Sequence, residues 1–166
     1  GVLERIDLAT GRDIGLVSEE EADSAGVADR AGEVRALVES ALASAIVKQA
    51  LSAPRLFREM PFSATGESWI TEGRIDLAFE EGGALTIVDF KTDAVTTEDE
   101  AAARARVYRP QALVYARALA DITGRPVRRV VFYFVRPGLT CIVPIDEGAQ
   151  MAGRRLLETG MELPPG

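Results

Sequence analysis

A hairpin signal in the middle of the chain constrains the fold more than any other feature of the sequence. Residues 68–80 and 84–91 are rich in apolar and β-branched side chains, which is typical of strands, and Gly82-Gly83 lies between them. A two-residue glycine link is typical of the tight turn that joins antiparallel strands, because glycine adopts positive φ angles at little cost. If these two glycines form the turn, Asp76 and Asp89 face each other directly across the strands.

Two directly opposed acids destabilise a sheet, so this arrangement requires compensation. A shared proton would supply it, as would a divalent cation or the neighbouring side chains of Lys91 and Arg74. A turn centred on Glu81-Gly82 would place the acids diagonally on the same face, and only a loop of odd length would separate them. The alternative is an ordinary network of acids and bases on a solvated face. The core would then lie on the other face, formed by Ile75, Leu77, Phe79, Val88 and Phe90.

The same residues suit a divalent cation. Mg²⁺ prefers carboxylate and carbonyl oxygens, so Asp76, Asp89 and the backbone carbonyl of Phe90 are candidate ligands. Lys91 follows on the same strand face, where its ammonium group would stabilise charge that develops on a phosphate. The pattern therefore favours metal-assisted chemistry on a phosphate ester.

The rest of the chain predicts an α/β fold with a mixed central sheet flanked by helices. Its length favours one domain spanning residues 1–166. Pro110 leaves open whether residues 98–122 form one helix or two. The other expected elements are the tail of a helix over 1–9, a loop over 10–32, a helix over 33–51 that ends before Pro54, strands over 55–62, 127–135 and 139–145, and a helix over 147–158.

Composition excludes several classes of function. The chain has no histidine, which removes Ser-His-Asp hydrolysis and His-ligated zinc. A single cysteine, Cys141, excludes a disulfide framework and an iron–sulfur cluster within this chain, and it favours a reducing, cytoplasmic location. No apolar run is long enough for a membrane helix, so no membrane partner is expected. The chain begins GVLERID without an initiator methionine, which indicates a piece of a longer protein.

Charge is distributed unevenly along the chain. The net charge is −7, yet the segment from Arg104 to Arg136 contains eight arginines and one acid. This asymmetry predicts a basic face that contacts DNA phosphates, with Arg104, Arg106 and Arg109 as candidate contacts. The alternative is that these arginines only solvate a helix.

Four motifs in fixed order resemble the PD-(D/E)XK nuclease domain of RecB/AddA-type helicase–nucleases, which are UvrD/Rep-like helicases. The motifs are EMPF (59–62), GRIDLAF (73–79), IVDFKTD (87–93) and YRPQALVYARAL (108–119), and the resemblance covers about residues 55–136. It implies a restriction-endonuclease-like fold. It also implies an Mg²⁺-dependent DNase of the exodeoxyribonuclease V type, in which Mn²⁺ substitutes for Mg²⁺. Such a domain is the C-terminal module of a DNA repair and recombination enzyme. Its partners are DNA, the helicase domains of the parent chain and a second helicase–nuclease subunit.

The resemblance also implies roles for single residues. Asp76 and Asp89 would bind the metal and Lys91 would assist catalysis. Gln111 and Tyr115 match the family's Gln-x-x-x-Tyr motif. They are also i, i+4 neighbours on one helix face, although a surface glutamine and a core tyrosine would look the same.

Two acids are supporting candidates. Glu59 matches the family's strand glutamate, with an ion pair to Arg58 as the alternative. Glu4 is a candidate outer-shell acid. The segment VLERID resembles the residues that come after the family's conserved histidine, which would therefore fall just before residue 1.

Two other functions compete with DNA hydrolysis. One is a catalytically weak or inactive DNA-binding or docking module that retains the nuclease fold. The presence of Asp76, Asp89 and Lys91 disfavours it. The other is a small-molecule α/β enzyme, for which a glycine-rich phosphate loop such as G-x-G-x-x-G is missing.

Overall fold

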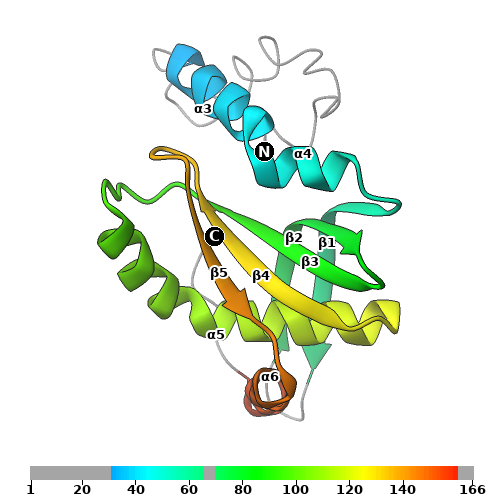
Figure 1. Cartoon of the computed structure of the whole chain (residues 1–166). Helices are drawn as coiled ribbons and strands as arrows, with labels where there is room; N and C mark the ends of the chain where they lie inside the picture. The colour runs from blue at the N-terminus through cyan, green and yellow to red at the C-terminus, as the bar shows by residue number, and fades with distance from the viewer. Residues whose placement is uncertain (1–30, 66–69, 161–166) are drawn as a thin grey trace. The chain divides into compact units, whose positions relative to one another are not determined.

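Five strands form one mixed sheet in the spatial order β1-β2-β3-β4-β5 (Figure 1). This computed structural model describes residues 31–65 and 70–160. Neighbouring strands are antiparallel except β3 and β4, which are parallel. The expected α/β architecture is confirmed. The strands are β1 (Leu56–Thr65), β2 (Ile70–Glu81), β3 (Ala84–Lys91), β4 (Val127–Phe134) and β5 (Leu139–Pro144).

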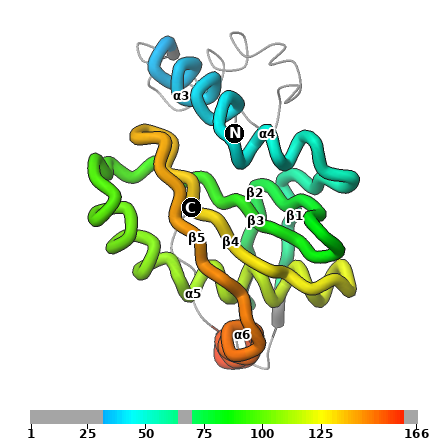
Figure 2. The backbone as a smooth tube through the Cα atoms, viewed as in Figure 1, coloured from blue at the N-terminus to red at the C-terminus, as the bar shows by residue number. Residues whose placement is uncertain are grey.

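Helix α5 (Glu98–Thr123) connects the two parallel strands. A parallel pair cannot be joined by a tight turn, so the connection must cross one face of the sheet. In the backbone trace α5 runs along that face, and α6 (Glu147–Thr159) lies beside it (Figure 2). The two helices pack closely because Gly153 of α6 has no Cβ, which would overlap the backbone carbonyl of Leu113.

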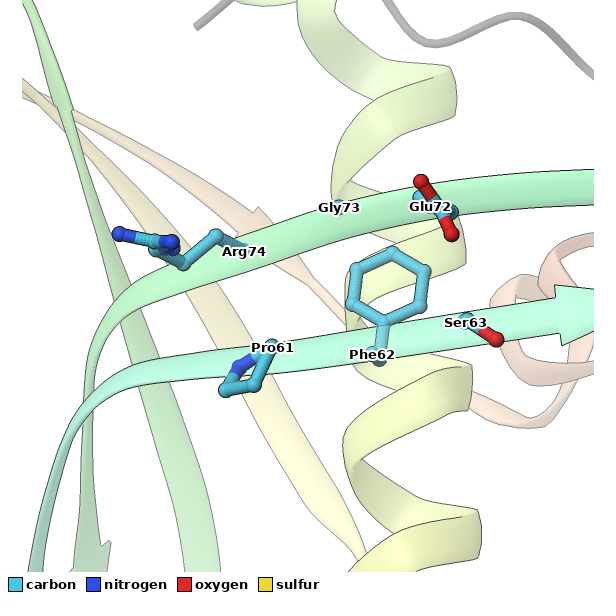
Figure 3. A pocket seen from close by; sticks show the side chains of 6 residues that line it. All are labelled: Pro61, Phe62, Ser63, Glu72, Gly73 and Arg74. Carbon is cyan, nitrogen blue, oxygen red and sulfur yellow. The ribbon is translucent and has the colours of Figure 1, made fainter.

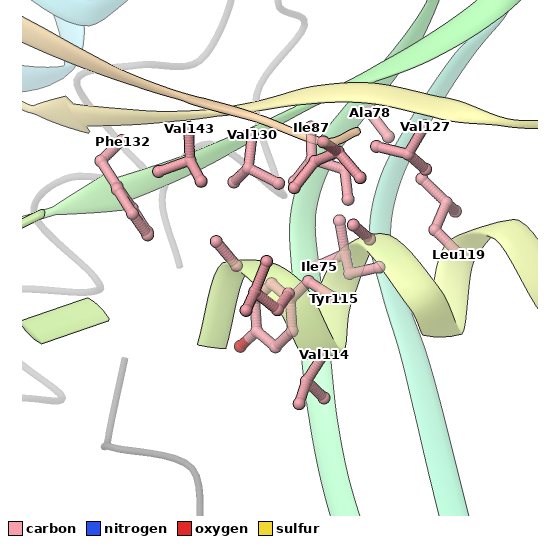
Figure 4. Close-up of a cluster of buried hydrophobic side chains, with 14 of the residues drawn as sticks. Ile75, Ala78, Ile87, Val114, Tyr115, Leu119, Val127, Val130, Phe132 and Val143 are labelled. Atoms are coloured by element: carbon pink, nitrogen blue, oxygen red, sulfur yellow. The ribbon is translucent and has the colours of Figure 1, made fainter. Parts of the chain in front are cut away.

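The main core fills the space between α5 and the sheet (Figure 4). Aliphatic and aromatic side chains from β2, β3 and β4 meet the buried face of the helix there. The cluster includes Ile75, Ala78, Ile87, Val114, Tyr115, Leu119, Val130 and Phe132.

The β2–β3 hairpin has the predicted register. Gly82 and Gly83 both have positive φ angles, 56° and 80°, as a tight hairpin turn of this kind requires. The ladder runs from Glu81–Ala84 to Leu77–Val88. Asp76 and Asp89 occupy the next opposed positions in this register.

The expectation of a single core face on this hairpin was wrong. In β3 every residue except Phe90 is buried, on both faces, because the strand lies in the middle of the sheet. Phe90, expected in the core, is only half-buried. The face that carries the two acids is covered by α5, so it is not a solvated face.

Helix α5 continues through Pro110 without interruption, which answers the question that the sequence left open. The side chain of Thr97 caps its first turn by accepting a hydrogen bond from the Glu100 backbone N–H at 3.2 Å. Within the described ranges, no helix combines the length and the apolar character that crossing a membrane would require.

The helices before the sheet form a separate compact unit, with the boundary between Ser52 and Ala53. They are α3 (Ala31–Ala43) and α4 (Ala45–Leu51). The prediction of one helix over 33–51 was therefore wrong. The backbone of Ser44 is extended, and its side chain accepts a hydrogen bond from the Val47 N–H and so begins a new helix.

Two expectations for the N-terminal part fall largely outside the described residues. These are the helix tail over 1–9 and most of the loop over 10–32, of which residues 31 and 32 belong to α3. The prediction of one domain over the whole chain stays a prediction.

Candidate functional site

An acid pair lies where β2 and β3 stop pairing. Asp76 of β2 accepts a hydrogen bond from the backbone N–H of Phe90 through its Oδ2, at 2.9 Å. This bond fixes the Asp76 carboxylate against the end of β3. Asp89 of β3 is only 3% exposed. Strand alternation thus delivers both carboxylates to the face covered by α5.

The pair holds its protons more tightly than ordinary carboxylic acids do. Burial, followed by the charge of Asp89, raises the pKa of Asp76 from 3.8 to about 7. Burial also raises the pKa of Asp89, although the ammonium group of Lys91 opposes the shift. Near neutral pH the two carboxylates therefore tend to share a proton. A cation placed between them would displace that proton.

Lys91 is a buried cation with several contacts to its ammonium group. Its side chain is 2% exposed. The Nζ atom lies 3.0 Å from Asp89 Oδ2 and donates a hydrogen bond to Gln111 Oε1 at 2.9 Å. A buried charge is tolerated only when it is paired and hydrogen-bonded, and Lys91 meets both conditions.

The residues fit a hard divalent cation in part. The Lys91 ammonium group is at ion-pair distance from Asp89 Oδ2 but is not aligned with it as a hydrogen-bond donor. This buried oxygen consequently has no hydrogen-bond partner among the described residues. An orphaned carboxylate oxygen beside a second carboxylate matches the ligand preference of Mg²⁺, with the Phe90 carbonyl as a further candidate. The described ranges contain no group of three or more His, Cys, Asp or Glu side chains suited to a metal.

Two residues of α5 complete the buried network. Gln111, which is 1% exposed, uses its amide nitrogen to donate to the Tyr115 hydroxyl at 3.0 Å. Burial, followed by the charge of Asp89, raises the pKa of Tyr115 to about 12, so the phenol stays protonated. Both side chains are buried, and Gln111 joins Tyr115 to Lys91. The surface position considered for Gln111 is therefore excluded.

Sequence reasoning missed a second group of side chains around Lys91. Its ammonium group lies over the ring of Tyr108, with Nζ 4.2 Å from the ring centroid. The Tyr108 hydroxyl donates to both carboxylate oxygens of Asp93, at 3.1 and 3.2 Å. Arg104 Nε is 3.0 Å from the same carboxylate. Tyr108 precedes Gln111 by three residues and so shares its helix face, and that spacing was the signal that could have revealed it.

Glu59 lies on β1 across from Asp76, since Arg58 pairs with Leu77 and Met60 with Ile75. Its φ angle is 47°, in the left-handed region that non-glycine residues seldom adopt. Its carboxylate is 3.5 Å from a guanidinium nitrogen of Arg74, which makes an ion pair across the strands. The other supporting candidate, Glu4, lies outside the described residues.

A shallow pocket of about 570 Å³ adjoins this part of the sheet (Figure 3). In the close-up, side chains of β1 and β2 line it, with the Phe62 ring between the two strands. Phe62 also packs edge-on against Tyr115, with the ring centroids 5.4 Å apart. The pocket thus connects through one aromatic contact to the buried network. Its lining is Pro61, Phe62, Ser63, Glu72, Gly73 and Arg74.

The arginine-rich segment is divided among several surroundings. Arg104 belongs to the Asp93 group, while the exposed Arg106 and Arg109 line a pocket of about 310 Å³ between α5 and β5. Arg125 and Arg129 form ion pairs with Glu80 and Glu81 of β2. Contact of the three candidate arginines with DNA stays a prediction.

Comparison with known proteins was made against families and curated sequences. A family model described as the PD-(D/E)XK nuclease superfamily matches residues 7–155. The chain is similar to proteins named as the subunit designated A of an ATP-dependent helicase/nuclease. The identity is 35% over 111 residues for the protein of Desulforamulus reducens and 33% over 146 residues for that of Alkaliphilus metalliredigens. For Acetivibrio thermocellus it is 38% over 84 residues.

These matches cover a large share of the chain and a small share of the relatives. They span 58%, 80% and 50% of this chain, but only 9%, 11% and 7% of the respective relatives. The similarity therefore concerns one region of much longer proteins.

Proposed function

The chain belongs to the PD-(D/E)XK nuclease superfamily, and on that premise we propose that it hydrolyses phosphodiester bonds of DNA with the help of Mg²⁺. The observation that carries the proposal is the buried group formed by Asp76, Asp89 and Lys91. Two proton-sharing carboxylates beside a buried ammonium group destabilise one another unless a ligand uses them.

Asp76, Asp89 and the Phe90 carbonyl would hold the cation, and Mn²⁺ would substitute for Mg²⁺. When bound, such a cation polarises the phosphate and eases ionisation of the attacking water. The chain's own contribution is to deliver both carboxylates in ionised form. Because the pKa of Asp76 is about 7, this requires loss of the shared proton near neutral pH.

Lys91 supplies positive charge where negative charge develops. Its ammonium group would donate to the attacking water or to a phosphate oxygen, and while charged it cannot act as a base. Gln111 orients the ammonium group through its amide oxygen and is itself held by Tyr115. The role of these two residues is therefore to keep the lysine beside Asp89.

The wider context of the reaction is proposed from the relatives. We infer that the chain is the nuclease module of a longer helicase–nuclease, acting in DNA repair and recombination in the cytoplasm, with exodeoxyribonuclease V-like activity. Its partners would be DNA, helicase domains of the same protein and a second helicase–nuclease subunit. The similarity to ATP-dependent helicase/nuclease subunits supports this proposal.

One observation favours a second candidate, a DNA-binding or docking module with weak or no catalysis. The described residues supply only two carboxylates to the site, with no third His, Cys, Asp or Glu beside them. A cation held by so few protein ligands binds weakly.

Single-turnover cleavage of labelled single- and double-stranded DNA in Mg²⁺ distinguishes the two candidates. We expect cleavage by the wild type and its loss in Asp89→Asn. The matched control is Asp121→Asn on α5, where an exposed acid pairs with Arg117, and it should cleave normally. DNA binding by the wild type without Mg²⁺-dependent cleavage would establish the second candidate.

A further inference from the structure

The ammonium group of Lys91 rests on an aromatic ring as well as on polar groups. Its Nζ atom is 4.2 Å from the centroid of the Tyr108 ring and 5.8 Å from that of Phe132. Asp89 and Gln111 supply the two oxygen partners already described. An ammonium group has three donors, so the tyrosine ring contacts it without adding a third oxygen.

The Tyr108 ring is itself fixed from two sides. Its hydroxyl donates to Asp93, whose carboxylate is also held by Arg104. Its ring packs against Phe132 of β4, with the centroids 5.7 Å apart. Burial, followed by the hydrogen bond to Asp93, raises the pKa of Tyr108, so the phenol keeps its proton and continues to donate.

A lysine requires such support because its four-carbon stem is flexible. An ammonium group bound only to oxygens would be held by strong directional bonds, whereas the face of a ring attracts a cation without such a bond. Contact with the ring can therefore locate the charge while leaving a donor for a phosphate oxygen. We propose that Tyr108, held by Asp93, is a positioning residue that fixes the Lys91 ammonium group for reaction. This inference rests on the proposed nuclease function.

Two substitutions separate the ring from its hydroxyl. Tyr108→Leu removes the ring, and we expect single-turnover cleavage at saturating DNA and Mg²⁺ to fall by at least about tenfold. Tyr108→Phe retains the ring and should cleave at nearly the wild-type rate. DNA and metal affinity should be unchanged in both, because neither substitution alters a proposed ligand.

A double-mutant cycle with Lys91→Ala tests whether Tyr108 acts through the lysine. In the Lys91→Ala background, Tyr108→Leu should cause no further loss of rate. A purely structural role would reduce cleavage by the same factor in both backgrounds, and that result would overturn the proposal. If the leucine variant does not fold, Asp93→Asn replaces it, with a smaller loss that is again confined to protein containing Lys91.

A spectroscopic measurement does not depend on activity. In the full-length natural protein, the ε-methylene and ammonium protons of Lys91 should show an upfield ring-current shift in NMR spectra. The shift should persist in Tyr108→Phe and vanish in Tyr108→Leu. Unchanged Lys91 signals in Tyr108→Leu would refute the contact. If the shift is present but the wild type does not cleave DNA, the proposed nuclease function fails while the positioning geometry stands.

Discussion

At the scale of single residues, Lys91 unites the whole site, because its ammonium group contacts Asp89, Gln111 and Tyr108. We expect Lys91→Ala to retain metal and DNA binding but to lose cleavage by on the order of a hundredfold or more, since charge on the phosphate is then unopposed. Arginine should rescue poorly, because its planar fork differs in reach. Single-turnover cleavage by the full-length natural protein is the measurement, with its ATPase activity as a folding control. Near-normal nicking would mean that the lysine only balances the acids.

Asp76 makes stability depend on pH in a defined direction. Its pKa is raised from 3.8 to about 7 in the folded protein, so protonation favours folding. This contribution is complete below about pH 4, declines as the pH rises, and is lost above about pH 7. Asp89, whose pKa is also raised, acts in the same direction. Without metal, the free energy of unfolding should therefore fall between about pH 5 and 7.5, as measured by urea denaturation.

Substitution of the acid identifies the source of this slope. Asp76→Asn should show a shallower dependence on pH, whereas Asp121→Asn, an exposed acid on α5, should match the wild type. With Mg²⁺ added, the stabilisation should be larger at high pH than at low pH, because binding requires ionised carboxylates. Equal slopes in the wild type and Asp76→Asn would show that the proton is not held there.

At the scale of elements, the packing of α6 on α5 depends on one glycine. A Cβ at position 153 would overlap the backbone carbonyl of Leu113, which cannot move without distorting α5. Gly153→Ala should therefore lower the free energy of unfolding by about 1–3 kcal/mol, despite the higher helix propensity of alanine. The control is Gly148→Ala in the same helix, where the new Cβ would make only an ordinary contact with Asp146. Equal stability of both variants in urea denaturation would contradict the close approach.

The exposed arginines of α5 test how DNA is bound. If Arg106 and Arg109 contact phosphates, replacing both by alanine should weaken DNA binding and make it less dependent on salt, with a slope lower by about two. Arg154→Ala with Arg155→Ala on α6 removes the same charge from another exposed helix and should leave affinity unchanged. Fluorescence anisotropy at several salt concentrations measures both. Equal losses would indicate a general effect of charge.

At the scale of the whole molecule, metal binding should be visible as stability. A cation that binds only the folded protein stabilises it by about 2.7 kcal/mol when its concentration is 100 times its Kd. We expect Mg²⁺ or Mn²⁺ to raise the melting temperature of the wild type in proportion to the logarithm of concentration. Asp89→Asn should show no such rise, since it removes the orphaned carboxylate oxygen. Calorimetric binding of equal strength to both proteins would place the metal elsewhere.

The sequence by itself determined the hairpin and what it carries. Two glycines with positive φ set the register of β2 and β3, and alternation then set Asp76 and Asp89 on one face. Such features depend on residues that are close together in the chain. For the same reason the order of strands and the existence of α5 could be predicted, and the break at Ser44 could have been, since serine favours N-caps.

Only the tertiary structure decided which face of the hairpin is covered and by what. The packing of α5 across the sheet buries Asp89 and Lys91, and it brings Gln111 and Tyr108 to the lysine from another element. The same applies to charge, because Arg125 and Arg129 meet acids of β2 and so do not add to a basic face with Arg106. These contacts join residues far apart in sequence. Their geometry follows from how a crossover helix settles on a twisted sheet, which no local pattern of residues specifies.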